Sequence, residues 1–158
     1  MKLEDKRREE KTDLLQLVGF KIDSEEFAIN ILIVQEIIKL LKITKVPNAP
    51  NFVEGVVNLR GRIIPVINLR TRLGMDEKKY DAETRIIVVD LSDKTIGFIV
   101  DEVKEVLRIP KSITEPPPEI VSGVDSEYIT AIGKLEDRLL ILLDLTKILS
   151  NSEHEQIA

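Results

Sequence analysis

The polar side chains that occur in pairs along this chain are its best candidates for acid/base catalysis. The chain holds 28 Asp and Glu residues among 158. Glu36 and Glu105 recur at matching places in the sequence, as do Asn68 and Asp144. A general acid and base would have to share a cleft and have separated pKa values. The spacing indicates neither, and duplicated groups of this kind more often cap turns or pair with Lys and Arg. We therefore expect structural roles for them.

The remaining composition excludes several classes of site. The chain has no Cys, so disulfides, thiolate metal sites and cysteine nucleophiles are absent. Its single His, His154, lies in a polar tail, which disfavours histidine metal sites and triads. Glycine-rich phosphate-binding motifs are missing as well. We expect that the protein is not an enzyme and that it binds no cofactor and no metal.

Charge and hydropathy limit the partners. A formal net charge of -5 argues against nucleic acid. No apolar run approaches the roughly 18 to 20 residues of a membrane span, and the charged N-terminus is not a signal peptide. We expect a soluble, cytoplasmic protein without direct membrane insertion.

Arg60 is the most conspicuous candidate for binding. It lies beside Gly61 at a predicted hairpin turn, where a smaller residue would be easier to accommodate. One interpretation is a solvated turn residue. The other is an exposed planar fork for a partner's carboxylate or carbonyl, because Arg is enriched in binding hot spots. Arg62 recurs as Arg138 and is expected to be structural.

Two apolar segments give a second candidate. Val34-Gln-Glu36-Ile-Ile and its copy Val103-Lys-Glu105-Val-Leu each follow a predicted hairpin. Val34, Ile37 and Val103 are either core residues or the wall of a groove that accepts a partner's helix. Both interpretations stay open at this point.

A duplication in the sequence must position these residues. A shift of 76 positions lays Arg62-Ile-Ile-Pro-Val-Ile-Asn-Leu on Arg138-Leu-Leu-Ile-Leu-Leu-Asp-Leu, and a shift of 69 lays residues 27–37 on residues 96–106. Self-similarity on this scale indicates a duplicated structural unit. The difference between the shifts predicts a longer loop in the second half.

Hydrophobic alternation predicts short strands in both halves. The expected strands are 14–22, 26–31, 52–59, 62–68, 84–91, 95–100, 103–109, 128–135 and 138–144. Residues 31–41 are expected to form a short helical turn that leads into a strand, and helical turns are expected at 69–73, before Gly74, and at 145–149. Pro65 indicates an edge or a bulge. The run 110–121, with three consecutive prolines, is expected to be the irregular inserted loop.

These elements predict an all-β fold of two pseudo-symmetric, five-stranded barrels with short helical turns, because closure removes exposed edges. We place a charged extension at 1–13, a first lobe at 14–74, a linker at 75–83, a second lobe at 84–149 and a polar tail at 150–158. Strands exchanged between the lobes would still make one domain overall. The extension is read as a solvated segment or, alternatively, a docking arm.

Several motifs resemble the CheW family of chemotaxis coupling proteins. The motifs are Val34-Gln-Glu36-Ile, Pro47, Phe52-Val-Glu-Gly-Val-Val-Asn-Leu-Arg-Gly61, Ile64-Pro-Val-Ile-Asn-Leu69, Gly97-Phe-Ile-Val-Asp101 and Leu140-Ile-Leu-Leu-Asp144. The block around Asn58-Leu-Arg-Gly61 is the most distinctive. The resemblance covers about residues 15–149, so nothing carries over to the extension or the tail.

The resemblance implies a non-enzymatic scaffold of two SH3-like barrels that couples chemoreceptors to the histidine kinase CheA. It implies a groove for the signalling tip of methyl-accepting receptors, formed by Val18, Ile31, Val34, Glu36, Ile37 and Val103. Arg60 would contact the receptor or the kinase. The regulatory domain of CheA would bind near Ile43, Val46 and Gly61, and the protein would associate with receptor arrays at the inner face of the membrane.

The same motifs occur in other settings. A CheW-like regulatory domain from the kinase itself, or from an adaptor fused to a receiver domain, would carry the same fold. A carboxylate-dependent enzyme is the alternative from a different class. Co-sedimentation with receptor tips and kinase distinguishes them, because only the scaffold joins both partners.

Overall fold

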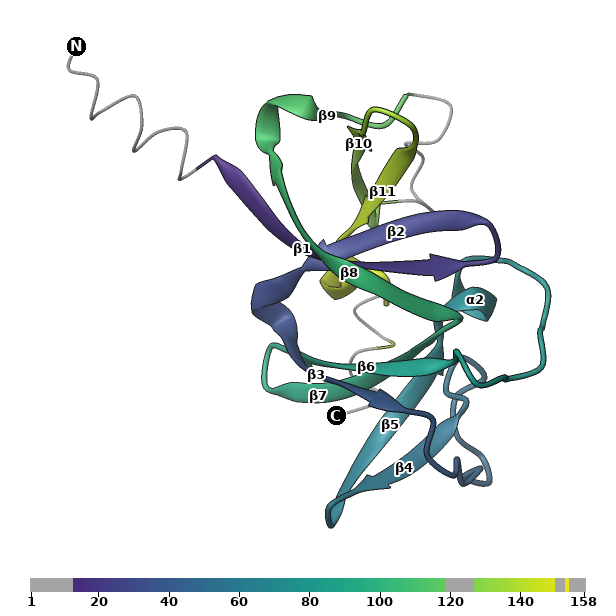
Figure 1. The fold of residues 1–158 in the computed structure, drawn as a ribbon. Coiled ribbons are helices and arrows are strands. Elements are labelled where there is room, and N and C mark those ends of the chain that lie inside the picture. Colours follow the sequence, from purple (N-terminus) through teal and green to yellow (C-terminus); the bar gives the residue numbers. More distant parts are fainter. Residues whose placement is uncertain (1–12, 119–126, 150–152, 154–158) are drawn as a thin grey trace.

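The structure is a computed structural model that describes residues 13–118, 127–149 and 153. Within these residues the chain is mostly strand, arranged in two sheets with short helical turns between them (Figure 1). The elements, in chain order, are β1 (Leu14–Ile22), β2 (Glu25–Asn30), η1 (Ile31–Ile33), β3 (Val34–Lys39), β4 (Gly55–Leu59), β5 (Arg62–Asn68), α2 (Leu69–Arg72), β6 (Arg85–Leu91), β7 (Lys94–Val100), β8 (Glu102–Pro110), η2 (Lys111–Ile113), β9 (Thr114–Glu115), β10 (Ile129–Lys134), β11 (Leu139–Leu143) and η4 (Leu145–Lys147).

The two sheets have the same plan. One runs in the order β8-β1-β2-β11-β10-β9 and the other in the order β3-β6-β7-β5-β4. In each sheet a three-stranded antiparallel unit joins a hairpin through one parallel contact, β2 with β11 and β7 with β5. The registers agree: Glu36 pairs with Val88 in one sheet, and 69 positions further Glu105 pairs with Gly19 in the other. The predicted duplication is therefore visible in the strand pairing itself.

Each sheet combines strands from both halves of the chain. β1 and β2 pair with β8 and β11 from the second half, while β6 and β7 join β3, β4 and β5 from the first. The sheets thus do not follow the lobes 14–74 and 84–149, because the strands are exchanged between them. As domain boundaries, those limits stay a prediction.

Both sheets close into barrels by the same device. After β3 the chain returns to the far edge of its sheet, where the backbones of Thr44 and Val56 exchange two hydrogen bonds of 2.9 Å. After β8 the chain continues through η2 to β9, which pairs with β10. One continuous run of chain therefore forms both edges of each sheet. The chain itself thus links the two edge strands of each sheet.

We call the barrel formed by the five-stranded sheet β3-β6-β7-β5-β4 the smaller barrel. In it, Gly55 on β4 allows the backbone of the 43–46 segment to approach closely. A Cβ at this position would lie 2.5 Å from the carbonyl oxygen of Thr44 and 2.6 Å from a methyl carbon of Ile43. Because the first of these atoms belongs to the backbone, a side chain would force the 43–46 segment away from β4.

Gly55→Ala is therefore expected to lower the free energy of unfolding by about 1–3 kcal/mol, the usual effect of overpacking a tight contact. Gly133→Ala is the matched control, because its Cβ would meet only side-chain atoms, the nearest at 3.4 Å. Urea denaturation of both variants measures the effect. An equal, small loss in the two would contradict the tight contact at Gly55.

Three apolar cores hold the fold together. Each barrel has an interior, built around Ile64 and Val88 in one and around Leu17 and Leu140 in the other. The largest core lies between the sheets, where Phe20 and Phe98 are almost fully buried. The shortage of aromatic residues is met by Ile, Leu and Val, as β-rich packing favours.

Most predicted elements are confirmed, with local differences. The turn at 31–33 leads into β3 as expected, and α2 ends before Gly74, which has a φ of 78°. Strand β4 begins at Gly55 and not at residue 52. The 110–121 run is not wholly irregular, because η2 and β9 lie within it.

Pro65 does not mark an edge strand. β5 lies between β7 and β4, but its contact with β7 covers only Val66 to Asn68. Pro65 precedes that contact, so its missing N–H removes no hydrogen bond to β7. The extension before residue 13 and the tail, except Glu153, lie outside the described residues.

Candidate functional site: surfaces around the outer strands of the two barrels

The predicted groove residues lie on or near the outer strands of the two sheets. Val34 begins β3 and Val103 lies near the start of β8; both are partly buried and pack on the core between the sheets. Ile31 is partly buried against the same core, whereas Ile37 is 40% exposed. Val34 and Val103 therefore fit the core interpretation, and the groove wall stays a prediction, to which the exposed Ile37 could contribute.

Val18 has a different position. Only 2% of it is exposed, and it belongs to the core between the sheets. It offers almost no side-chain surface to a partner, so its role is in the core and not in direct contact with a partner.

Two hollows adjoin the η1 turn. One, of about 180 Å³, is lined by residues 14–17 and 30–32. The other, of about 290 Å³, shares Leu15, Leu17 and Asn30 and reaches Leu142 to Leu145. Ile31 is the one predicted groove residue that lines either of them. Both of these hollows therefore lie beside η1.

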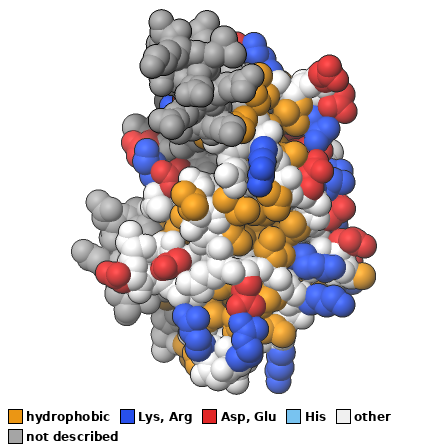
Figure 2. Space-filling view, turned by 60° about the vertical axis from the view of Figure 1, so that its left-hand side comes forward, with side chains coloured by type: hydrophobic (Ala, Val, Ile, Leu, Met, Phe, Trp, Pro, Cys, Tyr) orange, Lys and Arg blue, Asp and Glu red, His pale blue; other side chains and the backbone are white. Residues whose placement is uncertain are grey.

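Sequence reasoning missed the most exposed apolar residue of this region. Leu32, in η1, is 86% exposed, and Leu14 is 39% exposed beside the smaller hollow. Figure 2 shows hydrophobic side chains gathered in the middle of this face, with charged groups around them. We call Leu14, Ile31 and Leu32 the η1 surface. The apolar residues of 31–41 fit both a helix and a strand, so the sequence did not indicate which of them would be exposed.

Arg60 lies at the tip of the β4–β5 hairpin. Both turn residues have positive φ, 51° for Arg60 and 88° for Gly61, and the Asn58 side-chain oxygen accepts a 2.8 Å hydrogen bond from the Gly61 N–H. Asp23, Asn48, Ser92 and Asp93 are the other described non-glycine residues with positive φ, and all have short polar side chains. Arg60 is therefore an unusual occupant of its conformation.

The guanidinium of Arg60 donates to the carboxylate of Glu36 on β3. The Arg60 side chain is 70% exposed and that of Glu36 is 31% exposed. Hydrogen bonding to Glu36, with its charge, raises the pKa of Arg60. The two predicted site residues are thus brought together, which their sequence separation did not indicate.

The predicted kinase-facing residues lie near the edge of the smaller barrel where the 43–46 segment pairs with β4. We call this the closing edge. Val46 is 44% exposed and Ile43 is partly buried against the barrel interior. Gly61 lies at the hairpin tip with Arg60. The backbone hydrogen bonds between Thr44 and Val56 join this segment to β4, directly after Ile43.

The duplicated polar positions have structural roles. The side-chain oxygens of Asn68 and Asp144 each accept a 3.0 Å hydrogen bond from the N–H two residues ahead, capping α2 and η4. Glu105, the copy of Glu36, lies 3.5 Å from Arg138, which is the copy of Arg62 and not of Arg60. The expectation that these groups cap turns and pair with cations is confirmed.

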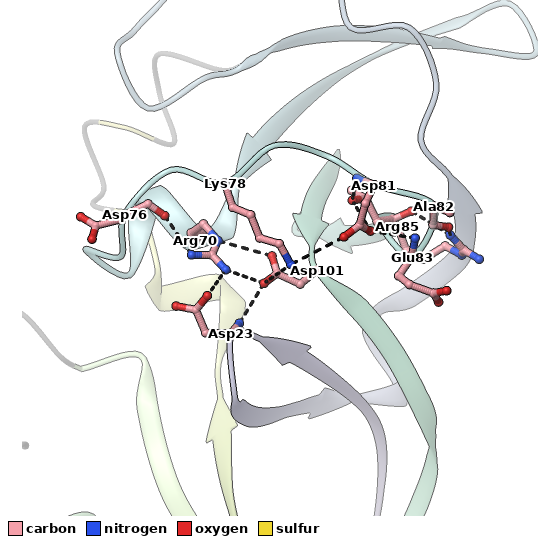
Figure 3. Close-up of polar contacts among 10 residues, drawn as sticks. Asp23, Arg70, Asp76, Lys78, Asp81, Ala82, Glu83, Arg85 and Asp101 are labelled. Carbon is pink, nitrogen blue, oxygen red and sulfur yellow. Dashed lines mark hydrogen bonds and ion pairs between the residues drawn. The ribbon is translucent and has the colours of Figure 1, made fainter.

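Arg70 is a buried cation that sequence reasoning missed. Its side chain is 5% exposed and pairs with Asp23, in the β1–β2 turn, and with Asp101, between β7 and β8, the latter at 2.5 Å. Figure 3 shows it between these groups, with a further 2.9 Å hydrogen bond to the carbonyl of Asp76. The cluster joins turns of both sheets to α2.

The electrostatics of the cluster favour its charged form. Burial acts to raise the pKa of Asp101, but hydrogen bonds from Arg70 and from the Asp23 N–H lower it below its usual range. Hydrogen bonds to Asp101 and Asp23 raise the pKa of Arg70. Neither the hydropathy nor the periodicity of the sequence indicates that Arg70, in the short helix α2 after β5, is buried.

The linker is held by Tyr80. Its hydroxyl donates a 3.0 Å hydrogen bond to Glu54 and accepts one from the Asn68 side chain. Burial and the nearby Glu54 charge raise the pKa of Tyr80 to about 12, so the hydroxyl stays protonated. The linker therefore lies against the barrel that contains β4.

No helix in the described part of the chain is long and apolar enough to cross a membrane. The fold and its exposed apolar surfaces define a double-barrel interaction module. The profile of the CheW-like domain matches residues 16–153. The chain belongs to the CheW family.

Individual relatives agree over most of the chain. It is 41% identical to the chemotaxis protein CheW of Helicobacter pylori, covering 90% of this chain and 86% of that protein. It is 40% identical to CheW of Klebsiella aerogenes, covering 85% and 81%. The crystal structure of the scaffolding protein TtCheW from Thermoanaerobacter tengcongensis has a TM-score of 0.80 at 35% identity, covering 88% of this chain and 96% of that one.

Proposed function

We propose that this protein is a non-enzymatic chemotaxis adaptor that couples chemoreceptors to the histidine kinase CheA. The observation that carries the proposal is the match to CheW proteins over nearly the whole chain, at up to 41% identity. A scaffold of this kind acts by holding two partners, and the described residues include exposed apolar side chains both at the η1 surface and at Val46.

The receptor tip is assigned to the η1 surface and the adjoining outer strands. An amphipathic helix binds an apolar groove through residues spaced three or four apart. Leu32 and Leu14 offer exposed apolar area, and the two hollows provide concave space beside them. With Ile31 at its centre, this receptor surface would continue along β3 and β8 through Val34, Glu36, Ile37 and Val103.

The kinase regulatory domain is assigned to the closing edge of the smaller barrel, with Ile43, Val46 and Gly61. This assignment leaves both partners free to bind at once. The complex would lie at receptor arrays on the inner face of the membrane.

Co-sedimentation tests the proposal. Purified protein is mixed with receptor signalling-tip fragments in an ordered assembly, with the CheA regulatory domain, or with both. We expect the protein to bind each partner alone and to increase the amount of kinase that sediments with receptor. A protein that binds neither partner, or binds only one, would contradict the adaptor function.

Arg60→Ala separates binding from folding. Because the side chain is 70% exposed, the denaturation midpoint is expected to stay near that of the wild type. Affinity for the receptor or the kinase is expected to fall by about tenfold or more if Arg60 is a hot spot. Arg62→Ala removes the same charge from the neighbouring exposed Arg and serves as the control, with both affinities expected to stay near those of the wild type. Unchanged affinity for both partners in Arg60→Ala would return Arg60 to a solvated turn role.

A further inference from the structure

Two cations face each other in the ladder between β3 and β6. Lys39 lies directly opposite Arg85, and like charges in this position destabilise a sheet. Elsewhere the ladders place opposite charges together: Lys21 lies opposite Glu26 on one side and Glu102 on the other. Among the strand pairs that the structure describes, the Lys39–Arg85 pair is the one with two charges of the same sign.

The chain continues this positive character beyond β3. Lys42 and Lys45 are both exposed on the segment that closes the smaller barrel. No described carboxylate lies within ion-pair distance of these three lysines or of Arg85. The Arg85 guanidinium instead donates to the backbone carbonyls of Ala82 and Thr84, at 2.8 and 2.9 Å, which leave its charge uncompensated. Lysines elsewhere, such as Lys104 and Lys134, do have acidic partners.

We propose that Lys39, Lys42, Lys45 and Arg85, here called the cationic strip, receive an acidic surface of the protein partner that binds at Ile43 and Val46. This inference rests on the proposed function, because it assigns the strip to the kinase-facing side. It adds the chemistry of the partner: carboxylates arranged around an apolar contact.

The surroundings favour a protein over a lipid or nucleic acid surface. The exposed apolar side chain of Val46 directly follows Lys45, and Ile43 lies between Lys42 and Lys45. An apolar centre with charges at its border is the usual arrangement of a protein interface. The formal net charge of the whole chain is -5, so an extended polyanion would meet repulsion outside the strip.

Charges at the rim of an interface mainly accelerate encounter. Complementary potentials raise association rates, and this gain disappears as salt screens the charges. The apolar contact, which breaks when the partners separate, would still set the dissociation rate. The proposal therefore predicts a kinetic effect that depends on salt.

The experiment compares two variants with the same loss of charge. K39Q/K42Q/K45Q neutralises the lysines of the strip, and K104Q/K111Q/K134Q neutralises three exposed lysines of the other barrel. Stopped-flow or surface-based kinetics measures binding to the CheA regulatory domain. At about 50 mM salt we expect the strip variant to associate roughly tenfold more slowly, with little change in dissociation rate. The control variant should associate at nearly the wild-type rate, and the difference should disappear near about 500 mM salt, where screening is strong.

The outcomes separate this inference from the proposed function. If the wild type binds the kinase domain but the two variants associate equally fast, the cationic strip is overturned and the adaptor function stands. If the wild type binds no kinase domain at any salt concentration, the proposed function fails first. Co-sedimentation with vesicles of an anionic phospholipid, lost in the strip variant alone, would overturn the proposal in favour of a membrane surface.

Discussion

Replacing Arg70 by Met is expected to lower the free energy of unfolding by about 3–5 kcal/mol at pH 7, because it removes one partner of a buried ion pair. The Asp101 side chain is 16% exposed and would lose its closest cation. Asp23, at 52% exposed, would regain water and contribute less to the loss. Urea denaturation at neutral pH measures the change.

The pH dependence of this loss has a definite sign. The pKa of Asp101 is lowered in the folded protein, so its ionised form stabilises the fold above about pH 4, the ordinary pKa of an unfolded Asp. That contribution is lost as the pH falls through the lower, folded pKa. In Arg70→Met, only the Asp23 N–H and Lys78 still oppose the effect of burial, so the pKa of Asp101 rises and Asp101 takes up its proton at a higher pH. The difference between variant and wild type should therefore narrow as the solution is acidified below about pH 4.

Lys78→Met is the matched control for charge. Lys78 lies 3.9 Å from the same carboxylate, but its side chain is 48% exposed, and exposed pairs contribute little. We expect a small loss of stability with a weaker pH dependence than in Arg70→Met, because Lys78 contributes less than Arg70 to lowering the pKa of Asp101. If Arg70→Met and Lys78→Met lose similar stability, Arg70 does not hold the turns together.

Leu32→Glu is expected to give the largest loss of binding. The side chain is 86% exposed in the free protein, so the change should leave the unfolding midpoint almost unaltered. Against a receptor helix, however, the new carboxylate would be buried without a partner. Affinity for receptor tips should fall by about a hundredfold or more, as for a central hot spot, while kinase binding is retained.

Leu139→Glu is the control, because Leu139 is also an exposed Leu, with 62% of it exposed. It lies at the start of β11, in the β10–β11 hairpin and away from η1. The variant should bind receptor normally. Val34→Glu is less informative, because Val34 packs on the core between the sheets and its replacement should also destabilise the fold. Equal receptor affinity in wild type and Leu32→Glu would remove the η1 surface from the receptor site.

The regular parts of this fold were predictable because alternation and turn chemistry are local signals. Val18, Phe20 and Ile22 were predicted to share one face of a strand and are buried in β1, and Arg60-Gly61 forms the turn of the β4–β5 hairpin. The duplication predicted that Glu36 and Glu105 occupy equivalent positions, as the strand registers confirm. These features depend on a few neighbouring residues or on direct comparison of two segments.

The features that escaped prediction depend on the third dimension. Which sheet receives β1 is decided by pairing with β8, far away in sequence, and no local pattern contains that choice. Burial of Arg70 is possible only because Asp23 and Asp101 come from other turns to surround it. Exposure of Leu32 arises because η1 turns it away from a core that accepts Ile31 and Ile33 on either side.

The exchange of strands also determines the order in which the molecule can be completed during synthesis. The smaller barrel has all its strands once the chain has reached Val100, at the end of β7. The hairpin of β1 and β2 is made first, but β2 must wait for β11, close to the C-terminus, before its second edge is paired. Until then a paired but uncovered apolar hairpin remains on the nascent chain, where it is open to aggregation. A cut anywhere in the linker would leave each fragment without the partner strands it needs, so the two halves of the duplicated sequence can fold only together.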